Sequence, residues 1–297
     1  MRKDVGEKLQ LGGTGHTGLG SWASARHIFI IAPTGKSGTN LLLNILINLK
    51  LAQRPIDGPL SREDYLLYHS DLLTEYANRT TLIWTKWKES QQGLPETASR
   101  LLVSIGDGLL SFFGPTGELP TVVKTPTTRN LMHSTQLFPS AKFLLIVRDG
   151  RDATESGMLS GYWSVYGEAF SAWAEGVREL LTFIRGPGAE SCGKNWVLMR
   201  YEGLLQSPED ELRPTIELLG GSPDIVNRDV IQGLPVYGSS DYGVGADGTF
   251  RWCVAERTES FQPIGRWNDW PRSTKDLFKK VAGNELIELG YEEDFNW

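Results

Sequence analysis

The chain has 297 residues, of which 40% are hydrophobic and 22% are charged. This length allows one large domain or two small ones, and the hydrophobic fraction is too high for a disordered chain. The formal net charge of −6 argues against a general nucleic-acid binder but leaves room for a local basic pocket. The two cysteines, Cys192 and Cys253, are too few for a disulfide framework and lack the spacing of a zinc site. No metal site is therefore expected.

The first 25 residues are rich in charged residues, glycine and threonine, and they are predicted to form a flexible N-terminal leader. No apolar segment typical of a signal peptide follows them. The most apolar run, residues 41–51, contains polar residues and is far shorter than the ~20 residues of a membrane span. The sequence therefore predicts a cytoplasmic protein with no membrane span and with a single domain over residues 26–297.

From residue 28 onward, short apolar runs alternate with longer helical patterns, which is typical of an α/β protein. The expected fold is a central parallel sheet flanked by helices. Residues 54–119 give the least clear pattern, apart from a polar, helix-like stretch over residues 61–76. Buried strands are predicted over residues 28–32, 121–124, 143–147 and 196–199, and helices over residues 39–51, from 126 to about 137, 170–184, from 207 onward and about 273–289.

A glycine-containing turn, residues 33–40, connects the first predicted strand to the first predicted helix. Free backbone N–H groups and the helix dipole favour an anion at such a helix start. Lys36 adds a positive charge, and Ser37, Thr39 and Asn40 add hydrogen-bond donors. The turn therefore predicts a phosphate-binding loop, with an ordinary capped turn as the alternative interpretation.

The sequence Gly35-Lys36-Ser37 matches the end of a Walker A loop, G-x-x-x-x-G-K-[ST], which would indicate a nucleotide-dependent kinase. The first glycine of that motif would fall at position 30, which is Ile30 inside the predicted strand. The loop is therefore shorter than a Walker A loop. It resembles instead the 5′-phosphosulfate loop of sulfotransferases that use 3′-phosphoadenosine 5′-phosphosulfate (PAPS).

A second segment resembles the motif with which this family binds the 3′-phosphate, an arginine after a strand and a serine eight residues later. Arg148 follows the strand predicted over residues 143–147, and Ser156 lies eight residues further on. The planar guanidinium suits a phosphate because it offers a fork of donors. The alternative is a solvated surface cluster in which Arg148 and Arg151 pair with Asp149 and Asp152.

Three further segments resemble the family in chain order. Lys124, followed by Thr125 and Pro126, resembles the element beside the transferred sulfuryl group, and Tyr201 resembles the tyrosine near the adenine. Gly265 and Arg266 stand where the family has a loop that closes over the 3′-phosphate, although the usual Arg-Lys-Gly order is not kept. The resemblance implies a P-loop-like sulfotransferase fold and the cofactor-binding residues Thr34, Gly35, Lys36, Ser37, Gly38, Thr39, Asn40, Arg148, Ser156, Tyr201, Gly265 and Arg266.

The resemblance also implies an activity: transfer of a sulfuryl group from PAPS to a hydroxyl or amine of a small-molecule acceptor, which leaves 3′-phosphoadenosine 5′-phosphate. In this interpretation Lys36 stabilises the leaving phosphate, and Lys124 acts on the sulfuryl oxygens or the leaving phosphate. A nucleotide-dependent kinase and a non-catalytic nucleotide-binding protein are the alternatives. The sequence predicts neither the acceptor's identity nor the oligomeric state.

The sequence leaves several candidates for the general base, the group that would take the proton of the acceptor. One branch of the family places a histidine two residues after the lysine of the second strand, where this chain has Pro126. His69 is preferred because it lies in the variable segment where family members build acceptor sites. The other candidates for the base are His133, Glu63 and Asp64, and the tryptophans that hint at an apolar or planar acceptor are Trp84, Trp87, Trp163 and Trp252.

Overall fold

The computed structural model describes residues 26–55, 66–85, 94–111, 117–239, 253–259 and 261–297. Its centre is a sheet with the strand order β2-β1-β3-β4, in which every neighbouring pair is parallel. The predicted central parallel sheet is therefore confirmed, while the predicted leader lies outside the described residues. The strands are β1 (His27–Ile31), β2 (Thr121–Thr125), β3 (Lys142–Val147) and β4 (Trp196–Arg200).

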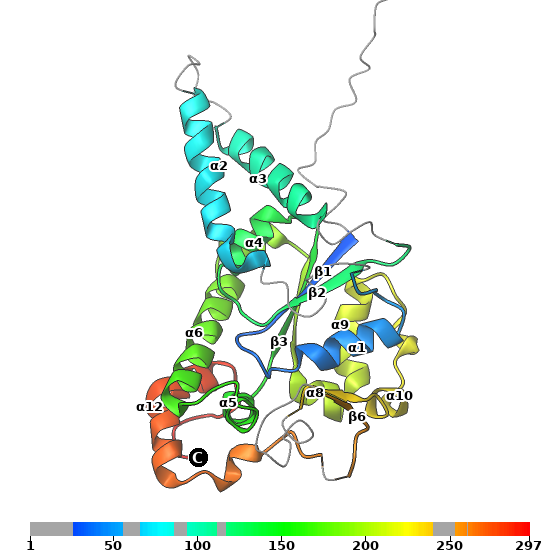
Figure 1. Ribbon diagram of the computed structural model, residues 1–297, viewed down its shortest axis with the longest axis vertical. Helices are drawn as coiled ribbons and strands as arrows, with labels where there is room; N and C mark the ends of the chain where they lie inside the picture. Colours follow the sequence, from blue (N-terminus) through cyan, green and yellow to red (C-terminus); the bar gives the residue numbers. More distant parts are fainter. Residues whose placement is uncertain (1–25, 56–65, 86–93, 112–116, 240–252, 260) are drawn as a thin grey trace, which may run out of the picture.

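Successive side chains of a strand point to opposite faces of the sheet, and they pack into two separate hydrophobic cores, one on each face. Phe29 and Ile31 of β1 face one core, whereas Ile28 and Ile30 face the other. Because both faces are covered by helices, the strands are largely apolar and buried, as expected for a parallel sheet, although β2 also contains the buried Thr121, Lys124 and Thr125. Figure 1 shows α6 and α12 on one side of the sheet and α1, α8 and α9 on the other.

The helices divide between the two faces. The face of Ile28 and Ile30 is covered by α1 (Thr39–Asn48), α8 (Tyr201–Gln206), α9 (Pro208–Leu218) and α10 (Arg228–Gln232). The other face is covered by α2 (Ser70–Thr85), α3 (Leu94–Leu110), α4 (Leu131–Leu137), α5 (Gly150–Leu159), α6 (Tyr166–Arg185), α7 (Pro187–Cys192) and α12 (Arg272–Glu288).

The region that the sequence left unclear contains a helical hairpin. A short 3-10 helix, η2 (Leu66–His69), leads into α2, and α3 packs beside α2, so that the pair projects from the body of the molecule (Figure 1). The sequence did not predict α3, because Pro95, Gly106 and Gly108 interrupt its helical pattern. Gly106 permits close packing, since a Cβ there would lie 2.3 Å from the carbonyl oxygen of Leu137.

The remaining elements are short. A two-stranded antiparallel sheet joins β5 (Val236–Tyr237) to β6 (Val254–Ala255), and two 3-10 helices are η4 (Pro223–Ile225) and η5 (Arg266–Asp269). Among the helices of the described residues, none has the length and hydropathy needed to cross a membrane.

Candidate functional site

A pocket of about 660 Å³ lies where the phosphate-binding loop predicted from the sequence meets the end of β3 and the C-terminal segment. The carboxyl ends of parallel strands form the usual ligand edge of such a sheet. Four of the described side chains that line this pocket are cationic, and none of the described lining side chains is acidic. The four are Lys36, Arg148, Arg257 and Arg266.

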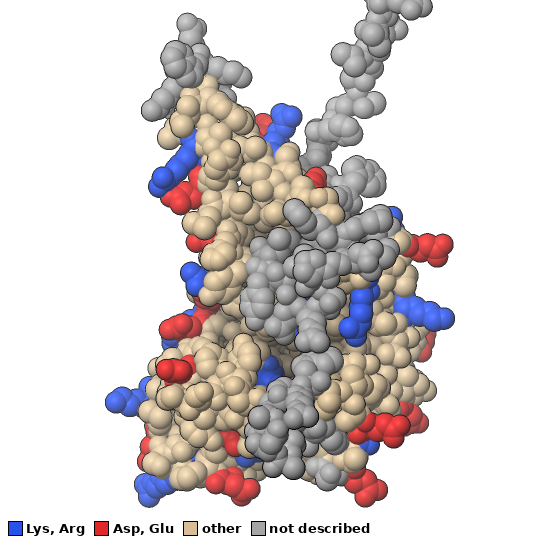
Figure 2. All heavy atoms as spheres, viewed as in Figure 1, with Lys and Arg blue, Asp and Glu red and all other residues tan. Residues whose placement is uncertain are grey.

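The positive charge is local to this pocket. Figure 2 shows acidic and basic side chains interspersed over the visible face of the molecule. The net charge of the whole chain is −6. The site is therefore a basic pocket in an acidic protein, which suits one anionic ligand rather than an extended polyanion.

The loop between β1 and α1, residues 33–38, has two residues in the left-handed region, Lys36 with φ 68° and Gly38 with φ 98°. A Cβ on Gly38 would lie 2.2 Å from Cδ2 of Tyr201, so the loop can approach this ring only with glycine at that position. Lys36 adopts the unfavoured conformation with a full side chain, a kind of strain that clusters at functional sites. Within the described part of the chain, no side chain caps the start of α1.

Arg148 joins the loop to the C-terminal segment and is only 4% exposed. Its Nη1 donates to the carbonyl oxygen of Lys36 at 2.7 Å and its Nη2 to that of Pro263 at 2.5 Å. Its guanidinium carbon lies 4.6 Å from the centre of the Tyr201 ring. The third guanidinium nitrogen, Nε, is buried, and its N–H has no partner among the described residues. A buried donor of this kind in a pocket is expected to meet a ligand acceptor.

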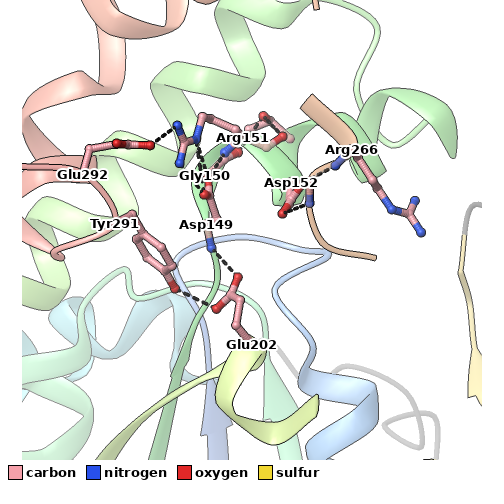
Figure 3. Close-up of polar contacts among 10 residues, drawn as sticks. Asp149, Gly150, Arg151, Asp152, Glu202, Arg266, Tyr291 and Glu292 are labelled. Atoms are coloured by element: carbon pink, nitrogen blue, oxygen red, sulfur yellow. Dashed lines mark hydrogen bonds and ion pairs between the residues drawn. The ribbon is translucent and has the colours of Figure 1, made fainter. Parts of the chain in front are cut away.

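The neighbouring charged residues do not form the solvated cluster considered as the alternative. Arg151 is 3% exposed, forms ion pairs with Asp149 at 2.7 Å and Glu292 at 2.5 Å, and contributes to the core rather than to the pocket lining. Asp152 is also buried and accepts hydrogen bonds from the backbone (Figure 3). Burial raises the pKa of Asp152, although the nearby Arg148 charge opposes this rise.

Tyr201 forms one wall of the pocket and is buried beside the loop. Burial raises the pKa of its phenol, and the charges of Arg148, Arg266 and Arg257 oppose the rise. Tyr201 is therefore a neutral aromatic surface at neutral pH, set against guanidinium groups. The next residue, Glu202, accepts from the backbone N–H of Asp149 and from the hydroxyl of Tyr291, which ties α8 to α5 and to the C-terminal tail (Figure 3).

The structure brings most of the predicted cofactor-binding residues into the pocket. The predicted Thr34 and Ser37 lie behind the lining, where the Ser37 hydroxyl donates to the Thr34 carbonyl oxygen at 2.9 Å, and Gly265 precedes the lining Arg266. Lys124 is buried opposite Ile30 in β2 and does not line the pocket, whereas Pro126 does. The predicted residues that line it are Gly35, Lys36, Gly38, Thr39, Asn40, Arg148, Ser156, Tyr201 and Arg266.

The two histidines considered as the general base, His69 and His133, lie outside the pocket lining. His69 is exposed in η2 with its ring edge-on to Tyr68, and His133 lies in α4, where its Nδ1 is buried with no partner among the described residues. Glu63 and Asp64 lie outside the described residues, as do Trp87 and Trp252. Trp84 is exposed on α2, and Trp163 packs beside Gly157.

The sequence analysis missed one charged residue of the pocket, Arg257. Its Nε, like that of Arg148, is buried without a partner among the described residues. Arg257 stands between Glu256 and Thr258-Glu259 in a segment with no helical or strand periodicity. No local signal distinguishes it from a surface arginine, and only its place in the fold brings it to the pocket.

The parallel sheet, the tight loop before α1 and the basic pocket define an α/β protein with an anion-binding site at the ligand edge of its sheet. A family model described as the sulfotransferase family matches residues 28–222, which include the loop, β3 and α8. The chain belongs to the sulfotransferase family. Comparison with curated protein sequences finds no match.

Several solved structures are similar to this chain. The sulfotransferase domain from the curacin biosynthetic pathway is 18% identical with a TM-score of 0.47, over 89% of this chain and 97% of that one. A sulfotransferase from Alicyclobacillus acidocaldarius is 12% identical with a TM-score of 0.44, over 89% and 94%. Mouse sulfotransferase SULT7A1 complexed with PAP is 14% identical with a TM-score of 0.43, over 92% and 88%. The family assignment rests on the match over residues 28–222.

Proposed function

We propose that this protein transfers a sulfuryl group from PAPS to a hydroxyl or amine of a small-molecule acceptor. The observation that carries the proposal is Arg148, a buried arginine that lines the pocket, joins the loop to the C-terminal segment and has an Nε without a partner among the described residues. The family match supports the reaction class. One of the similar structures is a sulfotransferase complexed with PAP, which supports the choice of nucleotide. PAP is 3′-phosphoadenosine 5′-phosphate, also called adenosine 3′,5′-bisphosphate, the product that PAPS leaves after the transfer.

The residues of the pocket fit such a nucleotide. The N–H groups at the start of α1 and Lys36 would hold the 5′-phosphate, because this end of a helix and a lysine both favour negative charge. Arg148, Ser156 and Arg266 would hold the 3′-phosphate, and the ring of Tyr201 would face the adenine. Thr39 and Asn40 add donors on the first turn of α1.

PAPS, when bound, supplies the activated sulfuryl group. In reactions of this class the enzyme mainly positions groups and neutralises charge around an in-line displacement. Lys36 is placed in the pocket to neutralise the charge that grows on the leaving phosphate. We also propose that Lys124 acts on the sulfuryl oxygens or the leaving phosphate, from its buried position near the end of β2.

We expect adenosine 3′,5′-bisphosphate to stabilise the protein by about 2.7 kcal/mol when its concentration is a hundredfold above its Kd. Arg148→Ala should raise that Kd by about 10–100-fold, because a hydrogen bond to a charged group contributes about 1.5–3 kcal/mol. Thermal unfolding with a series of adenine nucleotides, followed by calorimetry, measures both effects.

The same series separates the rival functions. ATP with Mg²⁺ should stabilise the protein much less, and stronger stabilisation by Mg·ATP would support the kinase. The position that a Walker A glycine would need is Ile30, buried in the middle of β1, which favours the sulfotransferase. Tight binding of the bisphosphate without turnover of labelled donor, across a broad acceptor screen, would support a non-catalytic nucleotide-binding protein.

We propose His69 as the general base, with His133, Glu63 and Asp64 as alternatives. The pH dependence of kcat tests this choice. With a histidine base, kcat should fall toward acid pH, because the protonated ring cannot accept the acceptor's proton. That fall should disappear in His69→Ala and remain in His133→Ala. A kcat that stays level down to pH ~5 would favour a carboxylate, Glu63 or Asp64.

A further inference from the structure

A single carboxylate holds the C-terminal segment against the rest of the site. Asp152 lies in the first turn of α5 and is 1% exposed. Its Oδ2 accepts the backbone N–H of Gly265 at 2.9 Å, and its Oδ1 accepts that of Arg266 at 2.7 Å. Figure 3 shows both bonds, with the Arg266 side chain directed away from Asp152. The two bonds join residues more than 110 positions apart in the chain.

The geometry of this contact requires a carboxylate. Gly265 has φ 81°, and this left-handed turn presents two consecutive N–H groups to the same acceptor. A carboxylate offers an acceptor oxygen to each, whereas the amide of asparagine offers one oxygen and turns an NH₂ group toward the other donor. The cost of burying the negative charge is offset in part by these two bonds and by the nearby Arg148 charge.

The segment that Asp152 holds supplies two features of the pocket. The carbonyl oxygen of Pro263 accepts from Nη2 of Arg148 and so fixes the plane of that guanidinium. The side chain of Arg266 lines the pocket. Asp152 itself does not line it. Its effect on a ligand must therefore act through Arg148 and Arg266.

We propose that Asp152 is a positioning residue that fastens the segment 263–266 over the pocket. It thereby holds Arg148 and Arg266 in the orientation in which they can bind an anionic nucleotide. The proposal rests on the proposed function for the identity of that nucleotide. The fastening is built into the free protein, so the segment does not need the nucleotide in order to close.

The test is Asp152→Asn, which changes one oxygen to nitrogen and keeps the shape of the side chain. The Kd for adenosine 3′,5′-bisphosphate should rise about tenfold, and the KM for PAPS should rise with it, while the KM for the acceptor stays unchanged. Hydrogen exchange at the amides of Gly265 and Arg266 should be slow in the free wild-type protein and faster in the variant. Exchange in the wild type is informative even if the variant fails to fold.

A double-mutant cycle distinguishes positioning from general stability. Because Asp152 acts partly through Arg266, the effects of Asp152→Asn and Arg266→Ala on the Kd should be less than additive. The matched control is Glu285→Gln, the same loss of a buried negative charge at a residue that pairs with Arg178 between α6 and α12, outside the pocket. This variant should leave the Kd for the bisphosphate unchanged.

The outcomes separate this proposal from the proposed function. If wild-type protein does not bind the bisphosphate, the proposed function fails, while slow exchange at Gly265 and Arg266 would still support the fastening. If wild-type protein binds and Asp152→Asn binds equally well, the positioning role is wrong. Rapid exchange of both amides in the free wild-type protein would also overturn it.

Discussion

Replacing Lys36 with alanine should lower kcat by about 10²–10³-fold while the KM for PAPS changes much less. Lys36 lines the pocket and its Nζ donates to the carbonyl oxygen of Gly238 at 3.1 Å, so its charge is held beside the loop. The proposed leaving phosphate gains negative charge during the transfer, and a nearby cation therefore stabilises the transition state more than the bound nucleotide. Steady-state kinetics with a labelled donor measure both quantities.

Lys50 provides a matched control for this variant. It also adopts the left-handed conformation, with φ 56°, but it is exposed at the end of α1 and does not line the pocket. Lys50→Ala makes the same change of side chain on the same kind of backbone, and we expect a normal kcat. A KM for PAPS that rises as steeply as kcat falls in Lys36→Ala would contradict the division of roles between Lys36 and Arg148.

Replacing Arg151 with alanine should lower the free energy of unfolding by about 3–5 kcal/mol. Its guanidinium pairs with Asp149 and Glu292 and lies 3.8 Å from the ring centre of Trp267 and 4.4 Å from that of Trp297. Its loss would leave the carboxylate of Asp149 buried without its cation. It would also release two indole rings from a cation that each contacts. Urea denaturation measures the change.

Arg185 is the control for the buried arginine. It pairs with Glu288 at 2.6 Å, but both side chains are exposed, so Arg185→Ala should cost no more than about 1 kcal/mol. An equal loss of stability in the two variants would show that burial of the Arg151 pair is not what stabilises the fold. A small loss in Arg151→Ala would show that the other contacts of the C-terminal tail, such as the Tyr291–Glu202 hydrogen bond, are enough to hold it.

Local patterns in the sequence determined much of the fold and part of the site. Each strand of the central sheet is a short apolar run bounded by turn residues, and this pattern predicted all four strands to within one residue at each end. The loop residues around Lys36 lie in one strand–turn–helix unit, β1 to α1, and the pair Arg148 and Ser156 lies in another, β3 to α5. Each unit brings its own residues together, and the resemblance to sulfotransferases predicted that the two units share a pocket.

Only the tertiary structure showed the features that depend on contacts between segments far apart in the chain. Helix α3 was missed because Gly106 is selected by its packing on Leu137 rather than by helix propensity. Arg257 reaches the pocket, Asp152 meets Gly265, and Arg151 enters a core between two tryptophans only after the chain has folded. No spacing in the sequence encodes these contacts, because the free energy of each depends on burial and on partners that lie far along the chain. The sequence by itself therefore predicted the loop that lines the pocket, and only the fold showed the buried charges that hold this loop and the C-terminal segment in place.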